Sequence, residues 1–223
     1  MAPTYNQHMT GGVEIPIFEL PVVLLPGELL PLHIFEERYK RMIGDCLDAD
    51  EPFGIVFRDT DGSARRVGCE ARVAEITERF DDGRMNIVVA GERPFKVLER
   101  FEATRYPAGE VAPIDDGDPD EPGASLEEDE NPAAAAQAAF AELVRRVGAD
   151  PPEPEELETA DSYGLAARVE LPAETKQRLL ELRSETERMG VLRAAFGALL
   201  RAVDRSREIA ERARMNGKVI IGR

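Results

Sequence analysis

Hydrophobic and polar positions alternate in short blocks over the first part of the chain. Apolar runs at 15–18, 22–25 and 29–32 are separated by Pro and Gly, and another apolar run covers 53–57. Between them, apolar residues recur every three or four positions over 35–47, which is the spacing of a helix. The pattern therefore predicts short strands at the four apolar runs and a helix over 35–47.

A strict alternation then begins at Val67 and changes phase. Apolar residues occupy every second position as far as Val73, and the pattern then shifts to Ala74 and Ile76. A shift of one residue turns the side chains to the opposite face of a sheet. We therefore predict a β-bulge at Val73–Ala74.

A turn sequence follows this strand. The segment Asp81–Arg84 contains Gly83, which supplies a positive φ, and the alternation resumes directly after it. Further strands are predicted at Phe95–Phe101 and Arg105–Ala112. Several short strands with one early helix are typical of a small closed or half-closed β-structure.

The second half of the chain has helical spacing. Asn131-Pro132 is a helix start and Gly148 is a helix stop, and Asn216-Gly217 ends the last helix. The other helices are predicted over 155–169, from Pro172 onward and around 189–203. The fold class is therefore α+β, with a β-rich part over 13–113, an acidic flexible linker over 114–130 and a helical part over 131–215.

The charge is concentrated in one segment. The chain has a net charge of −16, and between Pro113 and Asp161 there are 16 acidic residues but only two basic ones. A nucleic-acid-binding surface needs basic residues to neutralise phosphates, and this distribution argues against one. No apolar run reaches the length of about 18 residues that a membrane helix needs, and no signal peptide is visible. We expect a cytoplasmic protein that binds neither nucleic acid nor membrane.

Signatures of catalysis and of metal binding are missing from the sequence. It contains no phosphate-binding glycine loop, no dinucleotide fingerprint and no nucleophile elbow. The two cysteines, Cys46 and Cys69, are 23 positions apart, and the only histidines are His8 and His33. These residues form no metal-ligand spacing, so we expect no metal, no cofactor and no enzymatic activity.

The segment Leu30–Tyr39 reads L-P-L-H-I-F-E-E-R-Y and resembles the signature of the Lon protease N-terminal domain, the LON substrate-binding domain. The hairpin sequence D-G-R-M-N-I and the helical segments Leu171-Pro172 and 176–181 are also similar to that family. The resemblance implies a PUA-like pseudo-barrel followed by a helical bundle. It further implies a stand-alone, non-catalytic module without ATPase or peptidase domains, which binds unfolded or extended polypeptide. Weak self-association is a separate expectation.

The resemblance also supplies candidate binding or signature residues. They are His33, Phe35, Glu36, Arg38, Tyr39, Arg93 and Phe95. We expect Phe35 and Tyr39, one helical turn apart, to pin the helix onto the barrel. We expect His33 to be partly buried and hydrogen-bonded to the backbone.

The binding surface is expected where the barrel meets the helical bundle, by burial in a groove or by pairing with a free strand edge. Two other functions stay open at this point. PUA-like barrels elsewhere bind RNA, which would require a basic face, for example from Arg65, Arg66, Arg72 and Arg79. A pocket in the barrel would allow a small-molecule receptor or an enzyme.

Overall fold

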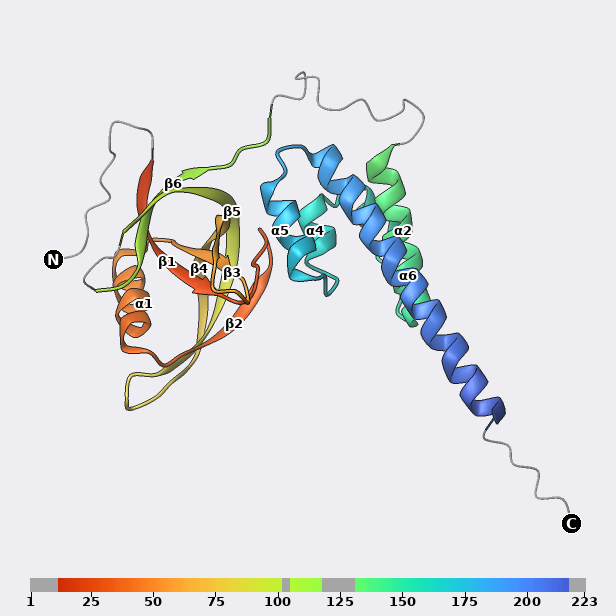
Figure 1. Cartoon of the computed structure of the whole chain (residues 1–223), viewed down its shortest axis with the longest axis horizontal. Helices are drawn as coiled ribbons and strands as arrows, with labels where there is room; N and C mark the ends of the chain where they lie inside the picture. The colour runs from red at the N-terminus through yellow and green to blue at the C-terminus, as the bar shows by residue number, and fades with distance from the viewer. Residues whose placement is uncertain (1–11, 102–104, 118–130, 217–223) are drawn as a thin grey trace, which may run out of the picture. The chain divides into compact units, whose positions relative to one another are not determined.

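The computed structural model divides into two compact units (Figure 1). The residues that it describes are 12–101, 105–117 and 131–216. The first unit is Met1–Glu121 with Ala166–Ser184, and the second is Pro122–Leu165 with Glu185–Arg223. The six strands, with α1 after β2, come before the other five described helices, so the predicted α+β class is confirmed. Most of the predicted linker, 118–130, lies outside the described residues.

The first unit is built on one mixed sheet. Its strands are β1 (Val13–Leu20), β2 (Leu29–Ile34), β3 (Phe53–Arg58), β4 (Ala64–Arg79), β5 (Met85–Phe101) and β6 (Ala108–Pro113). Helix α1 (Glu37–Ala49) follows β2, and helix α5 (Ala173–Glu181) also belongs to this unit.

The sheet closes into a ring through the longest strand. The strand order is β2-β5-β4-β3-β1-β6, and β5 also pairs with β6. The first part of β5 pairs with β2 and its last part pairs with β6, while β4 pairs along both parts. The ring β5-β4-β3-β1-β6 is therefore closed without β2, which adds to β5 at one end of the barrel.

The barrel core depends on close approach between strands. Ile15, Ile17, Phe95 and three valines form a buried cluster inside the ring, with Phe95 fully buried. A Cβ at Gly54 would lie 2.5 Å from Cζ of Phe95, and a Cβ at Gly68 would lie 2.4 Å from the Ile55 carbonyl oxygen. These two positions admit only glycine because the ring of Phe95 and the neighbouring backbone fill the space.

The predicted bulge and hairpin are confirmed. The register between β4 and β5 shifts between Val73 and Glu75. The turn after β4 has Gly83 at φ 81°, and the amide of Phe80 donates to the carbonyl of Arg84 at 2.9 Å. The predicted separate strand at Phe95–Phe101 is wrong only in its start, because β5 runs unbroken from Met85.

The predicted strand at 22–25 is wrong. This segment is a loop between β1 and β2, although Val23, Leu24 and Leu25 are buried. The amide of Leu25 donates to the carboxylate of Glu28 at 3.1 Å, and Gly27 turns the chain with φ 75°. The apolar pattern correctly indicated burial, but side-chain burial does not require a ladder.

The second unit consists of helices, with α2 (Pro132–Val147) packed on the long α6 (Glu185–Asn216). The side chain of Asn131 caps α2 at its start by accepting from two backbone amides, and Gly148 ends it with φ 88°. Phe140 and Phe196 meet between the two helices, with ring centroids 5.6 Å apart. The predicted helix over 155–169 is wrong in extent, because it is divided into α3 (Pro154–Thr159) and α4 (Ser162–Ala166).

Helix α5 groups with the strands, whereas the sequence placed it in the helical part over 131–215. Three side chains of α5 reach the barrel. Gln177 donates to the carbonyl of Val67 at 3.2 Å, Glu174 pairs with Arg65 at 2.9 Å, and Lys176 pairs with Glu28. These long-range contacts cannot be read from helical spacing.

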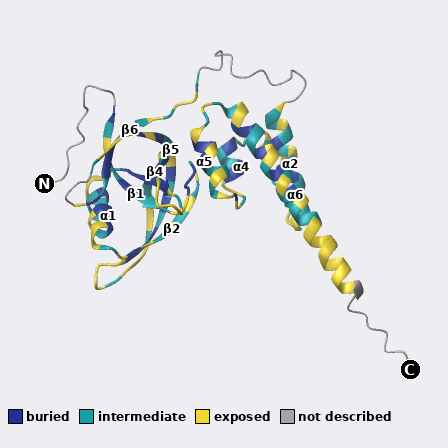
Figure 2. Ribbon diagram, viewed as in Figure 1, coloured by how far each residue is buried: buried dark blue, intermediate teal, exposed yellow. Residues whose placement is uncertain are grey.

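The end of α6 is solvated. Residues 205–214 are all exposed, and Figure 2 shows this part of the helix in yellow. Among the described residues, no helix combines the length and hydrophobicity needed to cross a lipid bilayer.

Candidate functional site

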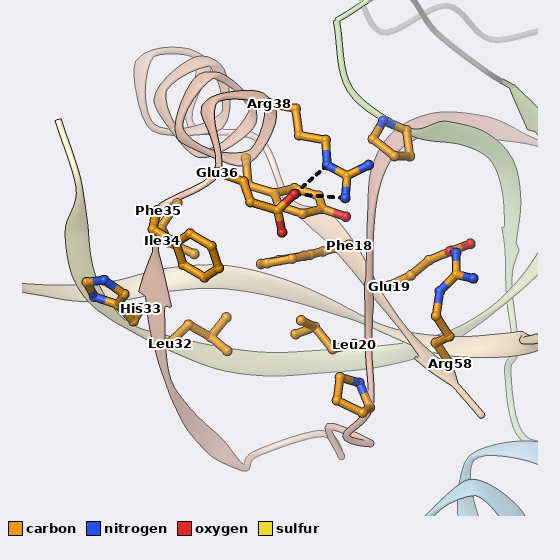
Figure 3. Close-up of a pocket in the computed structure, with 13 residues that line it drawn as sticks. Phe18, Glu19, Leu20, Leu32, His33, Ile34, Phe35, Glu36, Arg38 and Arg58 are labelled. Atoms are coloured by element: carbon orange, nitrogen blue, oxygen red, sulfur yellow. Dashed lines mark hydrogen bonds and ion pairs between the residues drawn. The ribbon is translucent and has the colours of Figure 1, made fainter. Parts of the chain in front are cut away.

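A pocket of about 400 Å³ opens in the first unit between β1, β2 and the start of α1 (Figure 3). Its lining residues are Phe18, Glu19, Leu20, Pro21, Leu32, His33, Ile34, Phe35, Glu36, Arg38, Tyr39, Arg58 and Pro107. Five of the seven candidate residues from the sequence are therefore brought together at one site: His33, Phe35, Glu36, Arg38 and Tyr39.

Apolar side chains form the interior of the pocket. Phe18 and Tyr39 are both buried, and their ring centroids are 4.0 Å apart. Leu20 of β1 and Leu32 of β2 point toward one another across the opening, as Figure 3 shows. Burial raises the pKa of Tyr39, and the nearby Arg38 opposes this increase only in part. The phenol is therefore neutral over the ordinary pH range.

Two ion pairs stand at the rim of the pocket. The guanidinium of Arg38 bonds to Glu36 with Nε–Oε2 at 3.0 Å and lies 4.6 Å from the ring centroid of Tyr39. Glu19 pairs with Arg58. An exposed pair such as Arg38–Glu36 contributes only about 0–1 kcal/mol to stability, and the two pairs together leave the rim polar but electrically balanced.

His33 is exposed, and it bonds to a side chain rather than to the backbone, so the prediction for this residue is wrong. Its Nδ1 lies 2.6 Å from Oδ1 of Asn86, and the Asn86 amide nitrogen donates to Glu78 at 2.9 Å. Because the amide oxygen of Asn86 faces the ring, Nδ1 is the nitrogen that carries the proton in the neutral histidine. Nε2 is then an acceptor, since the proton of the neutral ring is on Nδ1.

Phe35 does not pin the helix. It lies before the first residue of α1 and is 60% exposed, whereas Tyr39 is 6% exposed and packs on Phe18. The predicted helix begins two residues too early, and the side chain that the helical spacing assigned to the core lies at the mouth of the pocket. An aromatic ring with this exposure is available to a partner.

Arg93 and Phe95 lie outside the pocket. Phe95 is fully buried in the barrel core, and Arg93 pairs with the buried carboxylate of Glu70 at 2.9 Å. Both residues belong to β5, and their roles are in the packing of this strand in the barrel. They are not in a position to line the pocket.

Sequence reasoning missed the contribution of β1. Phe18, Glu19 and Leu20 line the pocket, yet they read as an ordinary strand end. Arg58 and Pro107 come from other strands and loops far along the chain. These residues lie near β2 only because of the order in which the strands pair in the sheet.

The basic face required for RNA binding is largely neutralised. Arg65 bonds to Asp59 and to Glu174, at 3.1 and 2.9 Å. Arg72 bonds to Asp50 and Glu92. Two of the four arginines named for this function are therefore occupied by carboxylates, which reduces the charge that they offer to phosphate.

Metal ligands do not gather in the part of the chain that the structure describes. Over residues 12–101, 105–117 and 131–216, no group of three or more His, Cys, Asp or Glu side chains is arranged to hold a metal ion. Both cysteines are buried and free.

The chain was compared with known proteins. The family model of the ATP-dependent protease La (LON) substrate-binding domain matches residues 14–192. Since the match covers most of the chain, the chain belongs to the LON substrate-binding domain family. The predicted resemblance is confirmed.

Solved structures agree with this assignment. A Lon N-terminal domain protein from Xanthomonas campestris is 25% identical with a TM-score of 0.59, over 81% of this chain and 97% of that one. The N-terminal domain of Lon protease from the Mycobacterium avium complex is 20% identical with a TM-score of 0.60, over 82% and 98%. The latter shows the similarity of fold alone.

The relatives among curated proteins are much longer than the matched region. The Lon protease of Cytophaga hutchinsonii is 24% identical over 106 residues, 44% of this chain and 13% of that protein. The Lon protease of Parabacteroides distasonis is 26% identical over 128 residues, 52% and 15%. The chain thus spans only a small fraction of the length of these relatives.

Proposed function

We propose that this protein is a non-catalytic, cytoplasmic polypeptide-binding module, which holds unfolded or extended segments at the pocket between β1 and β2. The observation that carries the proposal is the combination of an apolar interior with an exposed aromatic ring at its mouth, Phe35. Exposed apolar groups beside a pocket gain free energy when they are buried by an apolar partner. The family to which the chain belongs supports the same partner class.

The chemistry of the pocket favours holding over cutting. The charged side chains at its rim are two carboxylates and two guanidinium groups, and Arg38 and Arg58 each bond to one carboxylate. A bound chain would meet apolar contacts and balanced charges. We therefore expect a polypeptide to leave the site with its covalent structure unchanged.

The test is a titration with a permanently unfolded probe, reduced and carboxymethylated α-lactalbumin, using the full chain. We expect saturable binding and an unchanged intact mass of the probe after long incubation. Phe35→Ser should raise the dissociation constant about tenfold, because burial of a phenylalanine contributes about 1.5–3 kcal/mol.

The chain offers a matched control for this substitution. Val147 of α2 is 61% exposed, close to the 60% of Phe35, but it belongs to the other unit and does not line the pocket. Val147→Ser should change binding less than twofold. Equal losses in the two variants would place binding elsewhere, and absence of binding by the unaltered chain would end the proposal.

A second candidate function is favoured by the size of the pocket alone. A volume of about 400 Å³ falls in the range of small-ligand sites. A small-molecule receptor would leave the probe unbound, and its apolar ligand would raise the thermal midpoint of the unaltered chain but not of a Leu32→Glu variant.

Weak self-association stays a prediction, which sedimentation at several protein concentrations would measure.

A further inference from the structure

We propose that the bound segment is an extended strand that adds to the free edge of β2 and directs alternate side chains into the pocket. This inference rests on the proposed function and commits it to one mode of binding, in which main-chain hydrogen bonds as well as apolar contacts hold the partner.

The ladder connectivity leaves an opening at one end of the barrel. β6 pairs with β1 only through Val13–Pro16, and with β5 only from Phe95 onward. At the other end of the barrel, β2 pairs with β5, and the ladders of the described residues do not join β2 to β1. The pocket lies in this opening.

The edge of β1 can be followed residue by residue. The amide of Ile17 donates to the carbonyl of Pro107 at 2.9 Å, which is on the β6 side of the strand. Because backbone groups alternate along a strand, the N–H and C=O of Glu19 point to the same side, beyond the end of β6. Within the described ranges, no backbone partner reaches Glu19 on that side.

The edge of β2 is longer and suits a guest strand better. All six residues from Leu29 to Ile34 pair with β5 on one side, and over the described part of the chain no strand pairs with them on the other side. Pro31 fits this position, since proline cannot donate to a ladder and is found on edge strands. It also limits uncontrolled pairing with a second copy of the chain.

Strand directions fix how the guest would lie. β1 is parallel to β3, and the steps from β3 to β4, to β5 and to β2 are all antiparallel, so β1 and β2 run in opposite directions. A guest strand on β2 has side chains that alternate between two faces. One set would enter the pocket toward Phe18 and Leu20, which lie across the opening.

The chemistry of this opening selects the partner. Unpaired backbone groups are satisfied by another extended backbone, and an apolar interior is satisfied by apolar side chains. The partner is therefore an unfolded segment with apolar residues at every second position. A folded protein or a preformed helix would satisfy its own backbone groups and leave the edge of β2 unpaired.

An N-methyl scan tests the mode of binding. The probe is an acetylated octapeptide of alternating leucine and threonine between two lysines, titrated into the full chain. N-methylation removes one amide donor and keeps the side chain. We expect the dissociation constant to rise at least about tenfold at every second position and less than about twofold at the positions between, because only alternate N–H groups face β2.

Each other outcome contradicts the inference in a distinct way. Tolerance of methylation at all positions would mean that the peptide is held by side-chain burial alone, and the proposed function would stand. Loss at all positions would mean that the backbone is enclosed on both sides. Binding of carboxymethylated α-lactalbumin without binding of the octapeptide would also refute strand addition, whereas failure of both probes would refute the proposed function.

Hydrogen exchange on the complex gives an independent readout. The amides of β2 that do not face β5 should exchange at least tenfold more slowly when the octapeptide is bound. Ile55 of β3 is paired on both sides, with β1 and β4, and its exchange should not change. Equal protection of β2 and β3 would indicate general stabilisation rather than a new ladder.

Discussion

The two units of the molecule treat their polar groups in opposite ways. In the helical unit, Arg188 is 4% exposed, and its guanidinium bonds to the hydroxyl of Ser162 and to the carboxylate of Glu185 at 3.0 and 2.8 Å. Glu185 also accepts from the backbone amide of Ser162, at the start of α4. In this cluster, polar groups bond to one another around a buried guanidinium.

The barrel unit has the reverse arrangement at its pocket. There the charged pairs are at the rim, the edge of β2 has no strand partner among the described residues, and the ring of Phe35, which stacks on His33 with centroids 5.9 Å apart, is 60% exposed. A buried polar network therefore indicates a structural role, while an apolar opening beside an unpaired edge indicates recognition. Three experiments measure this contrast.

The largest effect is expected from the same substitution at two phenylalanines. Phe196 is fully buried against Phe140, and Phe196→Ala should lower the free energy of unfolding of the helical unit by about 4 kcal/mol. Phe35→Ala should lower stability by less than about 0.5 kcal/mol, since the ring is exposed. Urea unfolding followed by circular dichroism measures both, and similar losses would contradict the contrast.

A smaller effect is expected at two arginines. Arg188→Ala leaves Ser162 and Glu185 without their shared donor, and should cost about 2 kcal/mol because Glu185 is partly exposed. Arg38→Ala removes only an exposed pair and should cost less than about 0.5 kcal/mol. A large loss for Arg38→Ala would show that the rim of the pocket is structural, and the same urea titrations decide it.

The smallest effect is a dependence on pH that reports the barrel unit alone. Burial raises the pKa of Cys46 and of Cys69 from 9.0 to about 12. Below pH 9 both thiols are protonated in either state, and above it the unfolded chain ionises first. The free energy of unfolding should therefore fall as the pH rises from 9 to 10, by about 1 kcal/mol for each thiol.

Cys69→Ala isolates this contribution, because the variant should show a shallower decline between pH 8.5 and 10 than the unaltered chain. Alkylation of both thiols should be slow at pH 8 in the folded protein and fast in urea. Rapid alkylation without denaturant would mean that the barrel opens readily, and would contradict the burial of these residues.

Sequence alone predicted the features that local chemistry decides. The turn at Asp81–Arg84 follows from the backbone freedom of Gly83, and the bulge follows from a change of alternation at Val73. Asn131 caps α2 because its side chain meets the first amides of its own helix. Each of these signals lies within a few residues of the structure that it predicts.

The features that failed depend on distant parts of the chain. In the loop 22–25 the side chains of Val23, Leu24 and Leu25 are buried like those of a strand, and the Glu28 carboxylate accepts from the amide of Leu25. Phe35 continues a helical spacing but precedes the helix. The pocket itself could not be predicted, since it exists only where the ladder of β6 ends and the ladder of β2 begins. No local sequence pattern shows which strand will lie beside another in the sheet.

Strand β5 pairs with β2 along its first part and with β6 along its last part, and this arrangement affects which strand can separate from the sheet. Because the five-membered ring closes without β2, separation of β2 breaks one ladder and leaves the barrel intact. We therefore expect β2 to open locally at a lower free-energy cost than the five strands of the ring.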